Sequence, residues 1–454
     1  MTKPWLKVVV VAWLAGVGIA LAEPPAQPSQ PSQPIAPPAE GDKASSAVLI
    51  PPPIFPPAMA PCPKPGPVQV IGTFPPWQGE IAWASVDYQL LWIRPAPNSV
   101  PLLTTTTTTA PAPAVAGALN DPLATVLVGS NTVTYDGFNG AKVTAGLWFN
   151  FERDIGFEAS GFLTQSRTSS FGTNSNALGS PFLAVPFFDV NRQIESAIPL
   201  AVPNRLTGGE QVSTRAQFGS AEGNFLHPFC DEGEPRIEML CGFRYLTLQE
   251  KLAIQEQTGP TANFVGVSAL AFNGAANIVF PNVITYQDQF KTRNNFYGGQ
   301  VGVRSTWNLD RWFFKIQAEL AAGVTDESIQ ISGSAQRVNV PGGPVVDQAP
   351  SGIFAQASNI GSRSRTQFAV LPSAEVQVGF ELFPNKFIQA GYSFMYLSKV
   401  VRPGNEIDHS INTSQAAGLA DFNRFPNGPA SPAPLFSTSE FWAHGLEVGF
   451  KVTY

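Results

Sequence analysis

Residues 442–454 read WAHGLEVGFKVTY, and this stretch decides the fold. Apolar or aromatic side chains, with one histidine among them, occupy every second position, and alanine, glycine, glutamate, lysine or threonine fill the positions between. A period of two places the two sets on opposite faces of a β-strand. One face is apolar and the other carries small or charged side chains, which is typical of a strand between lipid and the interior of a membrane barrel.

The same alternation recurs upstream and predicts ten strands in all. The other nine segments are residues 86–92, 143–149, 155–163, 215–225, 237–247, 297–307, 314–324, 374–382 and 388–396. A further hairpin around Phe171 and residues 182–190 would raise the count to twelve.

The connections between these segments alternate strictly in length. Short ones lie at residues 150–154, 227–235, 308–311 and 383–386, and long ones at 95–141, 166–213, 255–287, 333–362 and 403–439. Outer-membrane barrels have short periplasmic turns and long external loops. We therefore predict an all-β fold: a transmembrane antiparallel up-and-down β-barrel of 10–12 strands, with both of its ends on the periplasmic side.

Composition agrees with a barrel and excludes other classes. Charged residues make up only 13% of the chain, against about 25% in typical soluble domains. The mean hydropathy of +0.02 is too low for a helical membrane bundle. A formal net charge of -6 gives no reason to expect a nucleic-acid partner.

The N-terminal part predicts export. Lys3 and Lys7 precede an apolar run at residues 8–19, and Ala20-Leu21-Ala22 forms a small-residue cleavage site, so residues 1–22 read as a signal peptide. In residues 23–82, 18 of 60 residues are proline, which predicts a disordered periplasmic tether. Residues 83–454 would then form the barrel, with membrane lipids and the barrel-assembly machinery as its partners.

Two sets of residues are candidates for function. Phe450, Val452 and Tyr454 end the last strand in the manner of the C-terminal signal by which such barrels are recognised for insertion. The predicted inner face carries Glu238, Arg244, Arg304, Lys315, Glu319, Glu375, Glu381, Glu447 and Lys451. These charges either line a narrow aqueous path or form salt bridges that fill a small barrel.

Catalytic chemistry finds little support. The three histidines, His227, His409 and His444, are scattered, and no nucleophile elbow, zinc-binding or phosphate-loop motif occurs. The three cysteines have no metal-site spacing, although Cys230 and Cys241 flank a turn and could pair. We expect no enzyme, no metal and no cofactor, and the sequence does not give the oligomeric state.

Several longer pieces resemble one family. These are Trp83 with residues 87–92 (DYQLLW), residues 242–245 (GFRY), residues 402–408 (RPGNEID) and residues 441–445 (FWAHG). They are similar to the seventh beta-barrel porin family of planctomycete outer membranes. Lys142 and Val185 depart from it, standing where the family pattern has arginine. The resemblance implies an outer-membrane barrel and no particular transport substrate.

Two functional hypotheses follow. The leading one is a narrow passive pore for small hydrophilic solutes, favoured by the charged inner face. The alternative is a closed structural barrel that anchors surface loops for envelope integrity or interaction, favoured because the loops outweigh the membrane-spanning residues.

Overall fold

A computed structural model describes residues 81–107, 116–150, 152–230, 235–264, 270–276, 278–416, 419, 421–423 and 425–454. The predicted signal peptide, and all of the predicted tether except its last two residues, lie outside the described residues. Within the described part of the chain, no helix has the length and apolar character to span a membrane.

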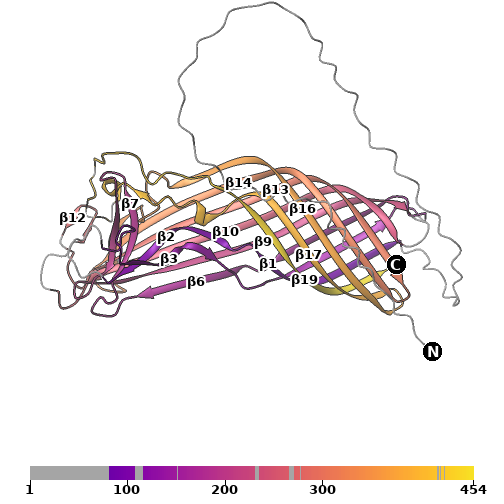
Figure 1. Ribbon diagram of the computed structural model, residues 1–454, viewed down its shortest axis with the longest axis horizontal. Helices are drawn as coiled ribbons and strands as arrows, with labels where there is room; N and C mark the ends of the chain where they lie inside the picture. Colours follow the sequence, from indigo (N-terminus) through magenta and orange to yellow (C-terminus); the bar gives the residue numbers. More distant parts are fainter. Residues whose placement is uncertain are drawn as a thin grey trace, which may run out of the picture. The chain divides into compact units, whose positions relative to one another are not determined.

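Ten strands of the described residues close into one antiparallel ring (Figure 1). In ring order they are β1 (Ala82–Ile93), β4 (Phe138–Trp148), β5 (Gly156–Thr164), β9 (Leu206–Cys230), β10 (Arg236–Pro260), β13 (Val283–Leu309), β14 (Trp312–Val338), β16 (Gly361–Phe383), β17 (Lys386–Val401) and β19 (Thr438–Thr453). β1 pairs with β19, so the first and last strands close the ring. The predicted all-β, antiparallel, ten-stranded barrel is confirmed.

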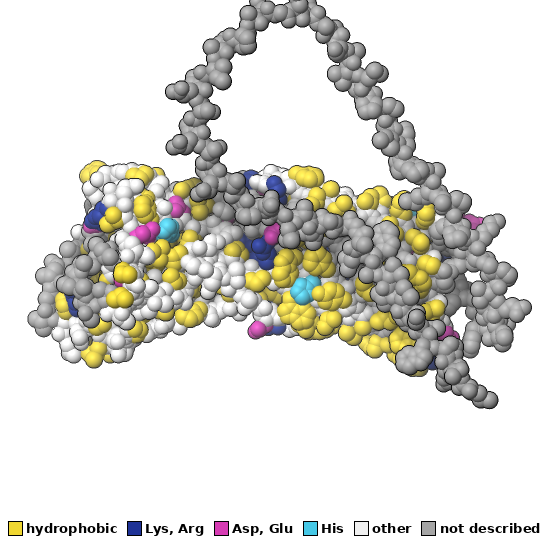
Figure 2. All heavy atoms as spheres, viewed as in Figure 1, with side chains coloured by type: hydrophobic (Ala, Val, Ile, Leu, Met, Phe, Trp, Pro, Cys, Tyr) yellow, Lys and Arg dark blue, Asp and Glu magenta, His cyan; other side chains and the backbone are white. Residues whose placement is uncertain are grey.

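The outer surface of the barrel changes character along its strands. On β14 the outward residues from Trp312 to Val324 are apolar, and those from Asp326 to Gln336 are polar. The apolar stretch spans about 30 Å along the barrel axis for tilted strands, which matches the hydrocarbon core of a membrane. Figure 2 shows hydrophobic side chains gathered on the half of the barrel nearer the C-terminus. We call this half the turn end, because the short connections lie there, and the opposite half the loop end.

The long connections are more ordered than predicted. β9, β10, β13, β14 and β16 have 25, 25, 27, 27 and 23 residues, about twice the length that crosses a membrane. The connections also contain the short strands β2 (Ala96–Thr106), β3 (Ala124–Val133), β6 (Arg167–Asn174), β7 (Leu183–Asp189), β8 (Ile194–Ala201), β11 (Ala271–Phe272), β12 (Ala275–Ala276), β15 (Val345–Ala349) and β18 (Ser410–Ile411), and the 3-10 turns η1 (Pro403–Asn405) and η2 (Thr413–Gln415).

Five of these strands, β18, β7, β2, β3 and β8, form a separate sheet that we call the cap. β7 lies at the end of the barrel opposite the C-terminus (Figure 1). The hairpin considered for residues 166–213 therefore does not enlarge the ring, because β6 pairs only with the extended part of β9 and β7 belongs to the cap. The ring keeps ten strands.

Candidate functional site: the barrel interior

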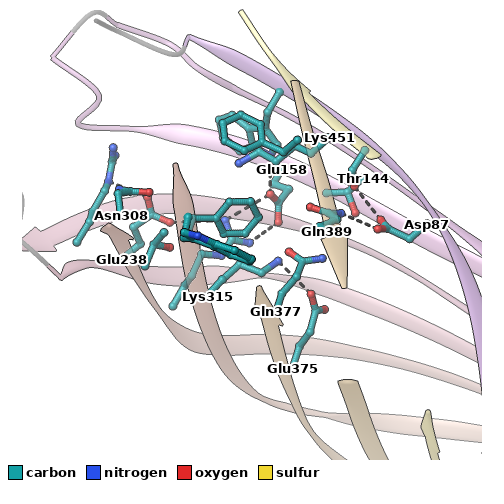
Figure 3. Close-up of a pocket in the computed structure, with 18 of the residues that line it drawn as sticks. Asp87, Thr144, Glu158, Glu238, Asn308, Lys315, Glu375, Gln377, Gln389 and Lys451 are labelled. Carbon is teal, nitrogen blue, oxygen red and sulfur yellow. Dashed lines mark hydrogen bonds and ion pairs between the residues drawn. The ribbon is translucent and has the colours of Figure 1, made fainter. Parts of the chain in front are cut away.

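A polar chamber occupies the turn end of the barrel. Its volume is about 160 Å³, and Figure 3 shows polar and charged side chains from several strands converging on it. Trp83 and Trp148, which lie near the ends of their strands, also line it. Trp83 faces inward, where its indole Nε1 donates a hydrogen bond of 2.7 Å to Glu158.

One network of ion pairs crosses the chamber. Arg304 on β13 pairs with Glu158 on β5 and, at 3.5 Å, with Glu238 on β10. Because β5 and β13 are three positions apart in the ring, the first of these pairs spans the lumen rather than joining neighbouring strands. The side chains of Arg304, Glu158 and Glu238 are each more than nine-tenths buried. These charges are therefore packed against one another.

A second network lies around Lys142 on β4. Its ammonium contacts Glu375 on β16 at 2.5 Å and Glu447 on β19 at 3.2 Å. Glu375 also pairs with Lys315 at 3.0 Å. β4 and β16 are four positions apart in a ring of ten, close to the largest possible separation. The lysine that replaces the expected arginine thus ties opposite walls of the barrel together.

A third network centres on Arg244 of β10. Its guanidinium lies 3.1 Å from both Glu222 and Glu319 and donates to the Ser373 hydroxyl at 2.9 Å. These side chains lie on the loop-end side of the chamber. The charged interior is therefore a set of interlocked pairs.

The structure brings together most of the residues that the sequence singled out. Glu238, Arg244, Arg304, Lys315, Glu319, Glu375 and Glu447 belong to the three networks. Lys451 lies over the rings of Phe313 and Phe387 at 5.1 and 5.7 Å. Glu381 is different, because it lies beside the turn between β16 and β17 and accepts a hydrogen bond from the Asn385 amide in an exposed position.

Sequence reasoning missed several members of these networks. Lys142, Glu158 and Glu222 lie on β4, β5 and β9, whose alternation is weaker than that of β14 or β19. The sequence does contain a signal for Lys142. Val143 and Ala145 lie on the outward face of the alternating pattern, which assigns Lys142 to the inner face. The proposed insertion residues end the outward face of the last strand, where Phe450 and Tyr454 are 65% and 74% exposed.

An apolar layer lies between the charged networks and the loop end. Its buried members are Leu91, Ile93, Phe138, Ala216, Phe218, Leu246, Leu248, Phe296, Ala321, Ala369, Leu371, Met395, Leu397, Val400, Phe441 and Ala443, and Phe162 packs against them. Every strand of the ring contributes at least one side chain to this list. The layer therefore extends across the whole cross-section of the barrel.

Phe218 on β9 occupies a central place in the apolar layer. Its ring centroid lies 5.5 Å from that of Phe138 and 5.7 Å from those of Phe162 and Phe441. β9 and β19, which carries Phe441, are four positions apart in the ring. The Phe218–Phe441 contact therefore crosses the lumen.

The cap adds a second apolar cluster at the loop end. Leu102, Leu183 and Phe187 of the cap pack with inward residues of the extended strands, among them Leu252 and Phe290. All five are 2% exposed or less. Side chains of the cap thus pack into the loop end of the barrel.

The described residues do not bring together a candidate metal site. No group of three or more potential metal ligands occurs among them. The carboxylate of Asp408, next to His409, accepts hydrogen bonds from the backbone amides of Ser410 and Ala433. Cys241 is free and exposed on the outer surface, and its cross-strand partner is Phe225 rather than Cys230.

Comparisons with known proteins point to one family. A family model described as "Putative beta barrel porin-7 (BBP7)" matches residues 83–454. Among solved structures, the outer membrane protease OmpT of Escherichia coli is 10% identical, with 83% of this chain and 97% of that chain covered and a TM-score of 0.35. A FadL homologue of Pseudomonas aeruginosa is 9% identical, with 83% and 90% covered and a TM-score of 0.18. No curated protein matches the chain.

Proposed function

The chain belongs to the beta barrel porin-7 family of outer-membrane barrels, and from this premise we propose that it is a closed barrel that anchors a folded cap at the cell surface. Its role would be envelope integrity or surface interaction, with no catalytic step. The loop end of an outer-membrane barrel faces outward, so the cap would be presented outside the cell.

The apolar layer is the observation that carries this proposal. An open porin keeps a water-filled lumen between inward polar side chains, and barrels of that kind use 16 to 18 strands. Here ten strands surround a layer in which Leu91, Phe218 and Phe441 are fully buried. A hydrophobic constriction of this kind excludes water and ions.

The passive pore remains the second candidate, and the polar chamber favours it. The chamber provides a polar, charged entrance at the turn end. A pore would require a path through both the apolar layer and the cap cluster. We therefore rank the pore below the anchor.

Replacement of the β2–β3 part of the cap, residues 96–133, by a short Gly/Ser linker tests the anchor. We expect the shortened barrel to insert in the outer membrane, and cells that carry it to lose surface binding or become permeable to bulky antibiotics. A matched control replaces residues 340–344, an exposed tip between β14 and β15 that lies outside the cap. The proposal would be overturned if cells with the β2–β3 replacement kept normal surface binding and normal resistance to bulky antibiotics. It would also be overturned if the wild-type protein conducted like a porin in planar bilayers.

A further inference from the structure

The outer surface of the barrel carries a cluster of positive charge just beyond the lipid-facing band. Outward positions on β10 and β13 are mostly apolar or aromatic from the turn end up to Tyr245 and Tyr297, and mostly polar beyond them toward the loop end. The two tyrosine rings lie 5.1 Å apart at this boundary, as interfacial aromatic side chains do. The boundary marks the outer edge of the hydrocarbon region.

Four cations lie on the loop-end side of this boundary, and we call them the basic patch: Arg215 on β9, Lys251 on β10, and Lys291 and Arg293 on β13. In the strand register, Lys251 is directly opposite Arg215 on one side and Lys291 on the other. Like charges directly opposite each other on neighbouring strands are destabilising. The patch therefore has an electrostatic cost in the free protein that a bound anion would remove.

No carboxylate neutralises the patch within the described residues. None of its four cations has an ion pair there, and Arg215 donates instead to the Ser166 hydroxyl at 2.8 Å. On β14, the outward Asp326 lies opposite Asn295 and accepts a hydrogen bond of 2.7 Å from Thr366. The patch thus keeps its positive charge.

The basic patch also borders a hollow in the barrel wall. The hollow measures about 510 Å³, and its other outward lining residues are neutral hydrogen-bonding side chains: Gln217, Gln249, Ser328, Gln330 and Ser362. Cations surrounded by amides and hydroxyls suit the several acceptor oxygens of a phosphate group. Shape and charge therefore point to the same class of ligand.

We propose that the basic patch binds the phosphorylated headgroup of an outer-leaflet glycolipid. Arg293 lies four residues beyond Tyr297, which places it about 10 Å above the hydrocarbon edge, and Lys291 lies about 16 Å above it. A phospholipid headgroup layer is only about 5–8 Å thick. A lipid with phosphates on its sugars reaches this height, while its acyl chains pack on the apolar band below. This inference does not depend on whether the lumen is closed.

The test uses the full-length protein in detergent micelles, with lipopolysaccharide as the probe and microscale thermophoresis as the measurement. Charge-assisted hydrogen bonds to phosphate are strong enough that Lys251→Gln with Lys291→Gln should weaken binding about tenfold or more. The matched control, Lys386→Gln with Lys399→Gln, removes two exposed lysines of β17 outside the patch and should bind as the wild type does. Both patch positions face outward, so the variant should fold.

Further probes separate the possible sources of phosphate. Dephosphorylated lipopolysaccharide should bind the wild type as weakly as intact lipopolysaccharide binds the patch variant. Phosphatidylglycerol in mixed micelles and inorganic phosphate should bind more weakly than intact lipopolysaccharide. Equal binding by wild type and patch variant, or equal binding of phosphatidylglycerol and lipopolysaccharide, would overturn the proposal. Without lipid, the patch variant should be at least as stable as the wild type, since it lacks the opposed charges.

Discussion

At the scale of single residues, Arg402 and Glu250 form a buried ion pair outside the lumen networks. Arg402 is fully buried, and it donates to Glu250 through Nε at 2.9 Å and Nη2 at 2.6 Å and to the carbonyls of Arg94 and Pro95 at 3.1 and 2.9 Å. It thereby joins the end of β17, the middle of β10 and the segment after β1. We predict that Glu250→Gln lowers the free energy of unfolding by about 3–5 kcal/mol, because it leaves a buried guanidinium without its counter-charge.

Urea titration in detergent measures this loss. The matched control is Glu440→Gln, which breaks the ion pair of Glu440 with Arg94, where the side chains are 48% and 37% exposed. That change should cost about 1 kcal/mol or less. Similar losses for the two variants would mean that the buried pair contributes no more than a surface pair.

At the scale of strands, the sequence predicts where the membrane-crossing parts lie and not how far the strands continue. On β14 the outward side chains are apolar up to Val324 and polar beyond it. The inward ones include Lys315, Gln317 and Glu319 in the first part, whereas Ile329 and Ile331 face inward in the second. The inversion occurs because the strand leaves lipid and enters the core that it shares with the cap. An inverted phase looks like the end of an alternating strand, so the predicted strand ends at residue 324 and residues 333–338 fall in a predicted long connection.

The extended strands also bring together three buried acids that form no ion pair with a cation of the described residues. Glu256 lies opposite Glu210 in the register, both face inward, and Asp288 lies on the next strand. They are 0%, 3% and 1% exposed. Burial raises the pKa of Glu210 to about 8 and that of Asp288 to about 6, and it raises the pKa of Glu256 well above its ordinary value, with further repulsion among the acids for both glutamates. Tyr286, opposite Glu256, also faces this group.

We predict that the loop end loses stability as pH rises from about 5 to 8. The folded pKa of Glu210 exceeds the unfolded value, so the folded state holds a proton that the unfolded chain releases in this window. Stability is then greatest below the unfolded pKa and falls by about 1.4 kcal/mol per pH unit for each such proton. Hydrogen exchange of the cap amides measures the slope. Glu256→Gln should flatten it, whereas Glu152→Gln at an exposed turn should not, and an unchanged slope in Glu256→Gln would contradict the assignment.

At the scale of the whole molecule, the contacts across the lumen could not be predicted from the sequence. Alternation assigns Arg304 and Glu319 to the inner face, but which inward residues meet depends on ring order and on the stagger between strands far apart in the chain. Lys142 and Glu375 are 233 residues apart, and only closure of the ring brings them into contact. The predicted inner face consisted of small or charged side chains. Phe218, within the predicted strand 215–225, and Phe441, just before residue 442, add large apolar side chains to that face.

The lumen has two apolar barriers, the apolar layer and the cap cluster, and we predict that conductance requires removal of both. Replacing Phe138, Phe218 and Phe441 by serine should hydrate the first barrier, since a polar lining no longer excludes water. Replacing residues 96–133 by a linker removes part of the second. In planar bilayers the wild type and each single change should be silent, and only the combined variant should conduct, provided that each migrates as a folded barrel before heating. Conductance from the serine variant alone would show that the cap does not seal the loop end, and conductance from the wild type would restore the passive pore as the better account.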